Sequence, residues 1–394
     1  MKNKNIRNVP ELRFPGFEGE WEKCKVRDIA TTTIGEFVIK SKQNDSYPYP
    51  VYNGGRTNTG FYDKYNNEGN KILVSARGNA GFVNIIKTRY WAGNSCYSID
   101  IIDKNKNNVD FTYYEMKLKE NVFIKNQQSA TIPSVSKSAV ENFELLIPLI
   151  QEQTKIGSFL ATIDALISET EKELEACREQ KRGMLQKMFP KKGETVPEIR
   201  FPGFTDAWEQ RKLGEMADIV GGGTPSTGVS DYWDGDIDWY APAEIAEQIY
   251  LTSSQRRITE EGYNHSSAKM LPVGTVLFTS RAGIGKTAIL TRKGCTNQGF
   301  QSIVPHKSEL DSYFIFSRTE ELKQYGETVG AGSTFVEVSG KQMANMELMM
   351  PKTMAEQKTI GQYFASLDNL ITLHQRELDR LLELKKGFMQ KMFC

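Results

Sequence analysis

Residues whose types could support catalysis occur in two stretches of the chain, and neither stretch completes a catalytic motif. Residues 283–287, Gly-Ile-Gly-Lys-Thr, end like a phosphate-binding P-loop, but Ser280 stands where that motif has its first glycine. A turn explains this run better than ATP binding. Asp234, Asp236 and Asp238 could act as general acids or hold a metal, yet they lie in a Trp- and Gly-rich stretch, where solvated aspartates and Asx turns are more common.

The histidines and cysteines show no metal-ligand or nucleophile spacing either. The histidines at 265, 306 and 374 are scattered, and the cysteines at 24, 96, 177, 295 and 394 are far apart and odd in number. This usage fits the reducing cytoplasm and excludes a disulfide scaffold. No two prolines are adjacent, so the Asn/Asp-Pro-Pro-Tyr/Phe motif of amino-methyltransferases is impossible. We predict no catalytic, cofactor-binding or metal-binding residue in this chain.

Composition points to a multidomain protein without a strong charge bias. A length of 394 residues suggests two or three domains. No run of 18 apolar residues occurs, and none follows the polar start, so we expect neither a membrane helix nor a signal peptide. The net charge of +1 divides into +5 for residues 1–149, 0 for residues 150–194, −6 for residues 195–351 and +2 for residues 352–394. This balance does not imply tight nonspecific nucleic-acid binding by the whole chain.

An internal repeat is the strongest signal. Residues 11–17, Glu-Leu-Arg-Phe-Pro-Gly-Phe, recur as Glu-Ile-Arg-Phe-Pro-Gly-Phe at 198–204, an offset of 187. Later blocks match at an offset of 204, with Glu-Gln at 152 and at 356, and with 181–189 repeated at 385–393. The second copy is therefore 17 residues longer, and we place the extra length between Ala217 and Arg281.

Each copy ends in a long proline-free stretch, at 152–188 and at 356–392, with apolar residues spaced alternately by three and four. Such a heptad pattern predicts helices of roughly 55 Å with an apolar seam. Because a lone seam would be exposed, we expect the two helices to pair as an antiparallel coiled coil; the alternative is two surface helices that pack separately on their own domains. The predicted seam or partner-docking residues are Ile156, Ile163, Leu166, Leu174, Met184, Ile360, Leu367, Leu370, Leu378 and Phe388.

The remaining parts read as α+β domains with twisted β-sheets. Short β-rich runs such as 71–75 and 273–279 alternate with Gly- and Asn-rich turns, and 311–323 is a candidate helix. We predict a globular domain at 1–149, a helical region at 150–194, a second globular domain at 195–351 and a second helical region at 352–394.

This duplicated layout resembles the specificity (S) subunit of type I restriction–modification systems over nearly the whole chain. The resemblance rests on the order, found twice, of a proline, Glu-Gln, an Asp followed by Leu-Ile, and the ending at 181–189 or 385–393. Residues 222–226, Gly-Gly-Thr-Pro-Ser, followed by 232–239, look like the opening of a target recognition domain. The first domain departs from this pattern, since Thr-Thr-Thr-Ile-Gly stands at 31–35 in place of that loop.

The resemblance implies a DNA-binding protein that belongs to a defence system against foreign DNA. Each globular domain would be a target recognition domain that reads one half of a bipartite, asymmetric site in double-stranded DNA. The helices would set the spacing and dock two modification subunits, which use S-adenosylmethionine to methylate adenine. Restriction subunits would add ATP- and Mg²⁺-dependent translocation and cleavage. The chain itself would be a cytoplasmic, non-catalytic subunit.

Base recognition needs hydrogen-bonding side chains on loops that reach the major groove. Arg77 and Arg281 are the leading candidates, because both follow a β run and precede a Gly-containing turn that lets the backbone approach DNA. The predicted DNA contacts are Arg56, Arg77, Asn79, Asn94, Gln128, Ser129 and Thr131 in the first domain, and Thr224, Ser226, Tyr240, Arg281, Lys286, Asn297, Gln298, Ser333 and Thr334 in the second.

Two other function classes fit parts of the sequence. A stand-alone nuclease or methyltransferase with an unfamiliar site would turn over DNA by itself, which the missing motifs argue against. A coiled-coil scaffold with two sensor domains for protein partners would fit the acidic second domain.

Overall fold

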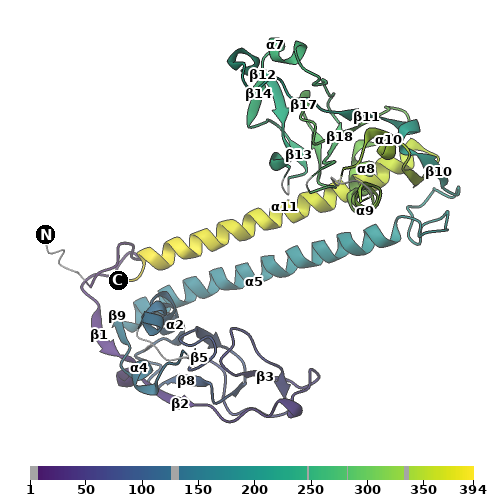
Figure 1. Ribbon diagram of the computed structural model, residues 1–394. Helices are drawn as coiled ribbons and strands as arrows, with labels where there is room; N and C mark the ends of the chain where they lie inside the picture. The colour runs from purple at the N-terminus through teal and green to yellow at the C-terminus, as the bar shows by residue number, and fades with distance from the viewer. Residues whose placement is uncertain (1–7, 126–132, 246–247, 282, 332–336) are drawn as a thin grey trace. The chain divides into compact units, whose positions relative to one another are not determined.

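The computed structural model describes residues 8–125, 133–245, 248–281, 283–331 and 337–394. Its contacts divide the chain into two compact units, here called unit 1 (Met1–Lys172 with Gln375–Cys394) and unit 2 (Glu173–His374). Each unit holds one globular part and one portion of each long helix, α5 (Ile150–Lys187) and α11 (Met354–Lys391) (Figure 1). The domain boundaries predicted along the chain follow a different division and stay a prediction. Among the described residues, no helix is both long and apolar enough to cross a membrane.

Unit 1 is built on a four-stranded antiparallel sheet in the order β2-β8-β5-β6, beside a three-stranded sheet β4-β3-β7 and the pair β1-β9. The apolar strand β5 is central in the larger sheet and almost wholly buried. Its elements are β1 (Glu22–Lys25), α1 (Val26–Ile29), β2 (Ala30–Ile34), η1 (Lys40–Lys42), β3 (Tyr49–Tyr52), β4 (Phe61–Tyr62), β5 (Lys71–Ser75), β6 (Val83–Ile86), β7 (Trp91–Ala92), β8 (Cys96–Ile101), α2 (Val109–Leu118), α3 (Asn121–Lys125), α4 (Lys137–Glu141) and β9 (Glu144–Ile147).

Unit 2 repeats this plan with a five-stranded sheet β11-β18-β15-β16-β13, a three-stranded sheet β14-β12-β17 and the pair β10-β19. Its elements are β10 (Glu209–Lys212), α6 (Leu213–Met216), β11 (Ala217–Gly221), η2 (Ser230–Tyr232), β12 (Trp233–Tyr240), η3 (Pro242–Glu244), β13 (Tyr250–Leu251), β14 (Arg256–Ile258), α7 (Glu260–Asn264), β15 (Val276–Phe278), β16 (Thr287–Leu290), β17 (Gly294–Thr296), β18 (Gln301–Pro305), α8 (Ser312–Ser317), α9 (Thr319–Gly330), α10 (Gly340–Ala344) and β19 (Glu347–Met350). The helix predicted at 311–323 is thus two helices, with Arg318 between them.

The extra length of the second copy lies where it was predicted. Tyr52 pairs in parallel with Ala92, and Tyr240 pairs in the same way with Thr296, so the two tyrosines are equivalent. Nearly all of the insertion therefore falls between Tyr240 and Arg281. It contributes β13 and α7, which have no counterpart among the described residues of unit 1.

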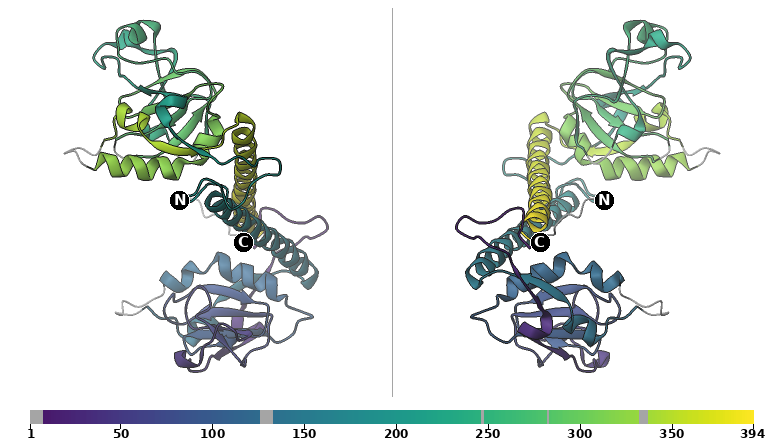
Figure 2. Two further views of the ribbon diagram at one scale, coloured as in Figure 1. Left: turned by 90° about the vertical axis from the view of Figure 1, so that its right-hand side faces the viewer. Right: turned by 90° about the vertical axis from the view of Figure 1, so that its left-hand side faces the viewer.

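The repeated Glu-Gln pair attaches each long helix to its own globular part. In unit 1, Glu152 accepts two hydrogen bonds from Arg13, at 2.6 and 2.8 Å, and Gln153 accepts one from the N-cap residue of α2. In unit 2, Arg200 donates to Glu356 at 2.7 and 2.8 Å, and the second Gln binds the N-cap residue of α8. These hydrogen bonds raise the pKa of both guanidinium groups. Helix α2 consequently lies between the sheet and α5 in unit 1 (Figures 1 and 2).

The two long helices run antiparallel within each unit, as predicted. In unit 1, the rings of Phe159 and Phe388 lie 4.9 Å apart, so a residue near the start of α5 meets one near the end of α11. In unit 2, Gln180 near the end of α5 donates to the hydroxyl of Tyr363 near the start of α11. The predicted helix ranges, 152–188 and 356–392, agree with the observed bounds within two residues.

The predicted seam is wrong at two equivalent positions. Leu166 and Leu370 are each 44% exposed, whereas Ile167 is buried. From Ile163, a spacing of three residues leads to Leu166 and a spacing of four leads to Ile167, and both are apolar. The structure buries the residue four positions on, Ile167. The other predicted seam residues are buried (Ile156, Ile163, Leu174, Ile360, Leu367, Leu378) or partly buried (Met184, Phe388).

Candidate nucleic-acid interface

Three loops of unit 1, which contain Gly54, Asn79 and Ser95, converge at the ends of its strands. The backbone N–H of Asn79 donates to the carbonyl of Gly54 at 2.9 Å, and that of Ser95 donates to the Asn53 side chain at 3.2 Å. Gly54 has a φ of +84°, and a Cβ there would lie 2.3 Å from the carbonyl oxygen of Arg77. Only glycine allows this close approach of the two loops.

The converging loops bring several predicted DNA contacts of unit 1 together. Arg56, Arg77 and Asn79 are exposed, and Asn94 is half-buried. Arg56 and Asn79 line a cavity of about 240 Å³, where the Arg56 guanidinium lies 5.7 Å from the ring centre of Phe82. Three further predicted contacts lie outside the described residues: Gln128, Ser129 and Thr131.

Unit 2 has an equivalent convergence of the loops 222–226 and 296–299 with Ser280, whose N–H donates to the carbonyl of Gly299 at 2.8 Å. Gly223 N–H donates to the carbonyl of Thr296 at 2.8 Å, and the Thr224 hydroxyl donates to Gln298 at 2.6 Å. A Cβ at Gly222 would lie 2.0 Å from the Asn297 oxygen, as one at Gly35 would lie 2.2 Å from the Gly93 oxygen. Gly35 is therefore the counterpart of Gly222. The prediction that residues 31–35 stand in place of the Gly-Gly-Thr-Pro-Ser loop is wrong, because residues 31–34 belong to strand β2, which pairs with β8 as β11 (Ala217–Gly221) pairs with β18.

Most predicted contacts of unit 2 lie on or beside these loops. Ser226, Arg281, Lys286 and Gln298 are exposed, and Thr224 and Asn297 are half-buried. Arg281 also forms an ion pair of 2.9 Å with Glu337. Two further predicted contacts, Ser333 and Thr334, lie outside the described residues.

The P-loop-like run is a turn, as predicted. The Thr279 hydroxyl accepts from Lys286 N–H at 2.9 Å and donates to the carbonyl of Gly283 at 2.7 Å. The strand β16 follows this turn, so the segment lacks the helix N-terminus that a P-loop uses to bind phosphate. Among the described residues, no group of three or more His, Cys, Asp or Glu side chains could hold a metal ion.

Tyr240 is a wrong prediction. Its side chain is fully buried in an apolar cluster with Leu271, Leu277 and Phe300, so it does not reach a base. Burial raises the pKa of its phenol to about 12. The equivalence of Tyr240 with Tyr52, both at the end of a strand, shows that this position builds the scaffold under the loops.

Two tryptophans that position the loop 222–226 were not predicted. The indole N–H of Trp239 donates to the carbonyl of Gly223 at 2.8 Å, and that of Trp233 donates to the carbonyl of Ser226 at 3.1 Å. Between them in sequence, Asp238 is buried and paired with Arg257 and Arg292. The sequence signal was the unusual pair of tryptophans immediately after the Gly-Gly-Thr-Pro-Ser loop.

A family model for the type I restriction modification DNA specificity domain matches residues 18–176 and again residues 205–383. The chain belongs to the family of type I restriction–modification specificity subunits. The duplicated match coincides with the two globular parts and their helices. Specificity subunits of this family are DNA-recognition components, and the two globular parts are its target recognition domains.

Individual relatives agree with this assignment. The chain is 35% identical over 181 residues to the type I restriction enzyme MjaIX specificity subunit of Methanocaldococcus jannaschii, a match that spans 45% of this chain and 41% of that one. It is 24% identical to the MjaVIII specificity subunit of the same organism over 98% of this chain and 95% of that one. A crystal structure of a type I system S subunit from M. genitalium matches 98% of this chain and 99% of that one with a TM-score of 0.74 at 17% identity, which supports the fold.

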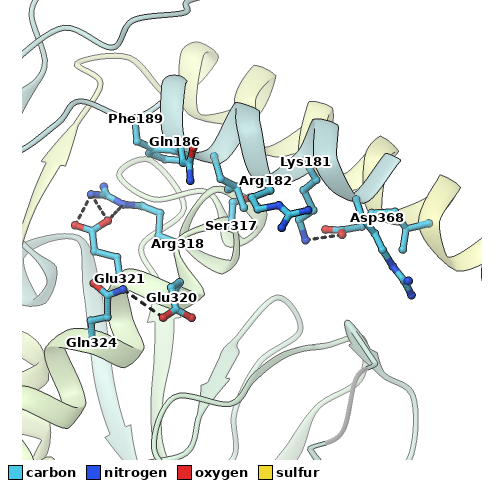
Figure 3. A pocket seen from close by; sticks show the side chains of 13 residues that line it. Lys181, Arg182, Gln186, Phe189, Ser317, Arg318, Glu320, Glu321, Gln324 and Asp368 are labelled. Carbon is cyan, nitrogen blue, oxygen red and sulfur yellow. Dashed lines mark hydrogen bonds and ion pairs between the residues drawn. The ribbon is translucent and has the colours of Figure 1, made fainter. Parts of the chain in front are cut away.

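Outside the recognition loops, this specificity subunit has a cavity of about 710 Å³ in unit 2, between α5, α8–α9 and α11. Leu185, Phe189 and Ile371 give it apolar lining. At one side Arg318 binds Glu321 through two hydrogen bonds, at 2.8 and 2.9 Å (Figure 3). None of its lining residues belongs to the loops 222–226 or 296–299, and several belong to the long helices α5 and α11.

Proposed function

We propose that this specificity subunit reads a bipartite, asymmetric target in double-stranded DNA, one half with each globular part, and directs adenine methylation and restriction by partner subunits. One observation carries the proposal. The two units repeat the same loop convergence, at Gly35 and at Gly222, but present different side chains on it. Equivalent scaffolds with different loops are what two independent half-site readers need.

The charge distribution supports dependence on partner subunits for DNA affinity. Phosphate contacts dominate affinity and require many cations. Residues 1–149 carry a net charge of +5, but residues 195–351 carry −6. Modification subunits that enclose the duplex would supply the missing positive charge.

Two equivalent docking sites for two modification subunits fit the surface of the long helices. Leu166 and Leu370 are related by the repeat and are each 44% exposed. Exposed leucines at matching positions suit contacts with the same partner made twice. The modification subunits would bring S-adenosylmethionine, and restriction subunits would bring ATP- and Mg²⁺-dependent cleavage; the complex would act in the cytoplasm, and the chain itself would contribute no bond-making chemistry.

The test is DNA binding by the purified chain with and without a co-expressed modification subunit, at about 150 mM salt. We expect sequence-specific, nanomolar binding only with the partner, since specific complexes of this kind bind in the range of roughly 10⁻⁸ to 10⁻¹¹ M. Nanomolar specific binding by the chain alone would contradict the dependence on partners. Turnover of DNA by the chain alone, with Mg²⁺ or S-adenosylmethionine, would contradict the non-catalytic role.

A further inference from the structure

Arg256 begins strand β14, the counterpart of β4 in unit 1, and its guanidinium lies over two tryptophan rings, here called the aromatic platform. Its guanidinium carbon is 3.6 Å from the ring centre of Trp233 and 5.8 Å from that of Trp239. Strand β14 pairs Arg256 directly with Trp239, so the two side chains share one face of the sheet. Both indoles are nearly buried, which fixes the platform under the guanidinium.

The same platform holds the loop 222–226. Trp239 binds the carbonyl of Gly223, and Trp233 binds that of Ser226, so the ends of the loop are tied to the two rings on which Arg256 lies. Arg256 and this loop of the candidate interface therefore contact the same two indole rings. Its position follows from the scaffold and not from a contact with another charge.

The guanidinium of Arg256 is available to a ligand. The side chain is exposed, and it has neither an ion pair nor a hydrogen bond with any residue that the structure describes. The next residue, Arg257, points to the other face and pairs with the buried Asp238 at 3.3 Å. Stacking orients the planar fork of five N–H donors in advance, which lowers the entropy lost when it binds two adjacent acceptors.

We propose that Arg256 is a DNA-contacting residue for the second half-site, donating two hydrogen bonds to adjacent acceptors on the DNA. This rests on the proposed function of the chain. Two parts of a duplex present such a pair of acceptors: the N7 and O6 atoms of guanine in the major groove, and two oxygens of a phosphate. Every other arginine described in residues 195–351 forms an ion pair within the chain, so in this acidic domain Arg256 is the arginine whose fork of donors is exposed and pre-oriented for DNA.

The experiment uses the full chain co-expressed with its modification subunit, in the forms wild type, Arg256→Ala, Arg256→Lys and Lys307→Ala. Lys307 is a matched control, because it is an exposed cation of the same domain that lies away from the loop 222–226. It follows the end of β18 at Pro305, which pairs with Ala217, whereas the loop 222–226 follows the other end of β11 at Gly221. Binding to duplexes that vary each half-site is measured together with the methylated motif in cells. We expect Arg256→Ala to weaken binding by roughly 5- to 150-fold, and Lys307→Ala to leave it unchanged.

The two sources of acceptors give different results. If Arg256 reads guanine, Arg256→Ala relaxes one position of the second half-site, and Arg256→Lys does not restore it. If Arg256 binds a phosphate, affinity falls equally for all sequences, the salt dependence decreases by about one phosphate contact, and Arg256→Lys restores part of the affinity. If the Arg256→Ala variant keeps the wild-type affinity and the wild-type methylated motif, the proposed role of Arg256 is wrong, while the proposed function of the chain is unaffected. Loss of sequence-specific recognition by the wild type itself would instead overturn the proposed function, and this role with it.

Discussion

Lys181 of α5 donates a hydrogen bond of 2.6 Å to Asp368 of α11. The other oxygen of Asp368 accepts from the hydroxyl of Tyr313 in α8, at 2.8 Å. In unit 1, Asp164 binds Lys385 in the same way, at 2.5 Å, and accepts from the hydroxyl of Tyr114 in α2. Each aspartate therefore joins both long helices to its own globular part. Burial is the main cause of the raised pKa of both phenols, which keeps them protonated as donors.

These two aspartates should differ in their contribution to stability. The Asp368 side chain is 7% exposed and that of Asp164 is 32% exposed, so water screens the second group more. Asp368→Asn should lower the stability of unit 2 by about 1.5–3 kcal/mol, and Asp164→Asn should lower that of unit 1 by less. Hydrogen exchange measures each unit separately. A larger loss for Asp164→Asn would contradict this ranking.

Cysteine cross-linking tests the direction of the helices in solution. With the native cysteines replaced, a pair at Ile163 and Lys385 should form a disulfide, because Lys385 binds the neighbouring Asp164. A pair at Ile163 and Leu367 should remain reduced. Efficient cross-linking of the second pair would mean that the helices run parallel.

Leucines on the helices should divide by exposure into two classes of effect. Leu370→Asp and Leu166→Asp should leave the fold intact and weaken binding of the modification subunit, because both side chains are already 44% exposed. Leu367→Asp should instead destabilise unit 2 by several kcal/mol, since Leu367 is buried and an unpaired charge there loses its hydration. Thermal unfolding and co-purification with the partner separate the two effects. Unfolding by Leu370→Asp would restore the originally predicted seam.

The repeat made the helices predictable, because matching blocks fix both their ranges and their chain direction. It did not fix the face of the seam, since the adjacent residues Leu166 and Ile167 satisfy the apolar pattern equally well. Both copies contain the same arginine and glutamate, Arg13 and Glu152 in the first and Arg200 and Glu356 in the second. Their pairing is not predictable from the sequence, because nothing in one sequence shows that residues 139 positions apart are in contact.

The sequence predicts where the candidate DNA-binding loops lie, but not which of their side chains are exposed and which are buried. A strand end followed by a glycine turn predicts where loops lie, which placed Arg77 and Arg281 on the surface. Burial depends on packing between distant segments, so Tyr240 was assigned to DNA although it is buried in the core. The platform under Arg256 required strand pairing that no local pattern reveals.

Arg77→Ala and Arg281→Ala should affect different halves of the target. Both side chains are exposed at equivalent loop ends, one in each unit. Loss of one good bidentate contact should weaken discrimination in its own half-site by about 1–3 kcal/mol. The smaller effect is expected for Arg281, which is partly occupied by Glu337. Binding to duplexes altered in one half at a time checks this, and an effect of Arg77→Ala on the second half-site would contradict it.

Independent reading of the two half-sites is the central claim, and exchange of one globular part tests it most directly. Residues 12–149 are replaced by the equivalent domain of a relative, and the methylome is sequenced in cells that also express the modification subunit. The account predicts that the motif changes in one half-site, while the other half-site and the spacer stay the same. A motif rewritten in both halves would show that the two globular parts do not read separately.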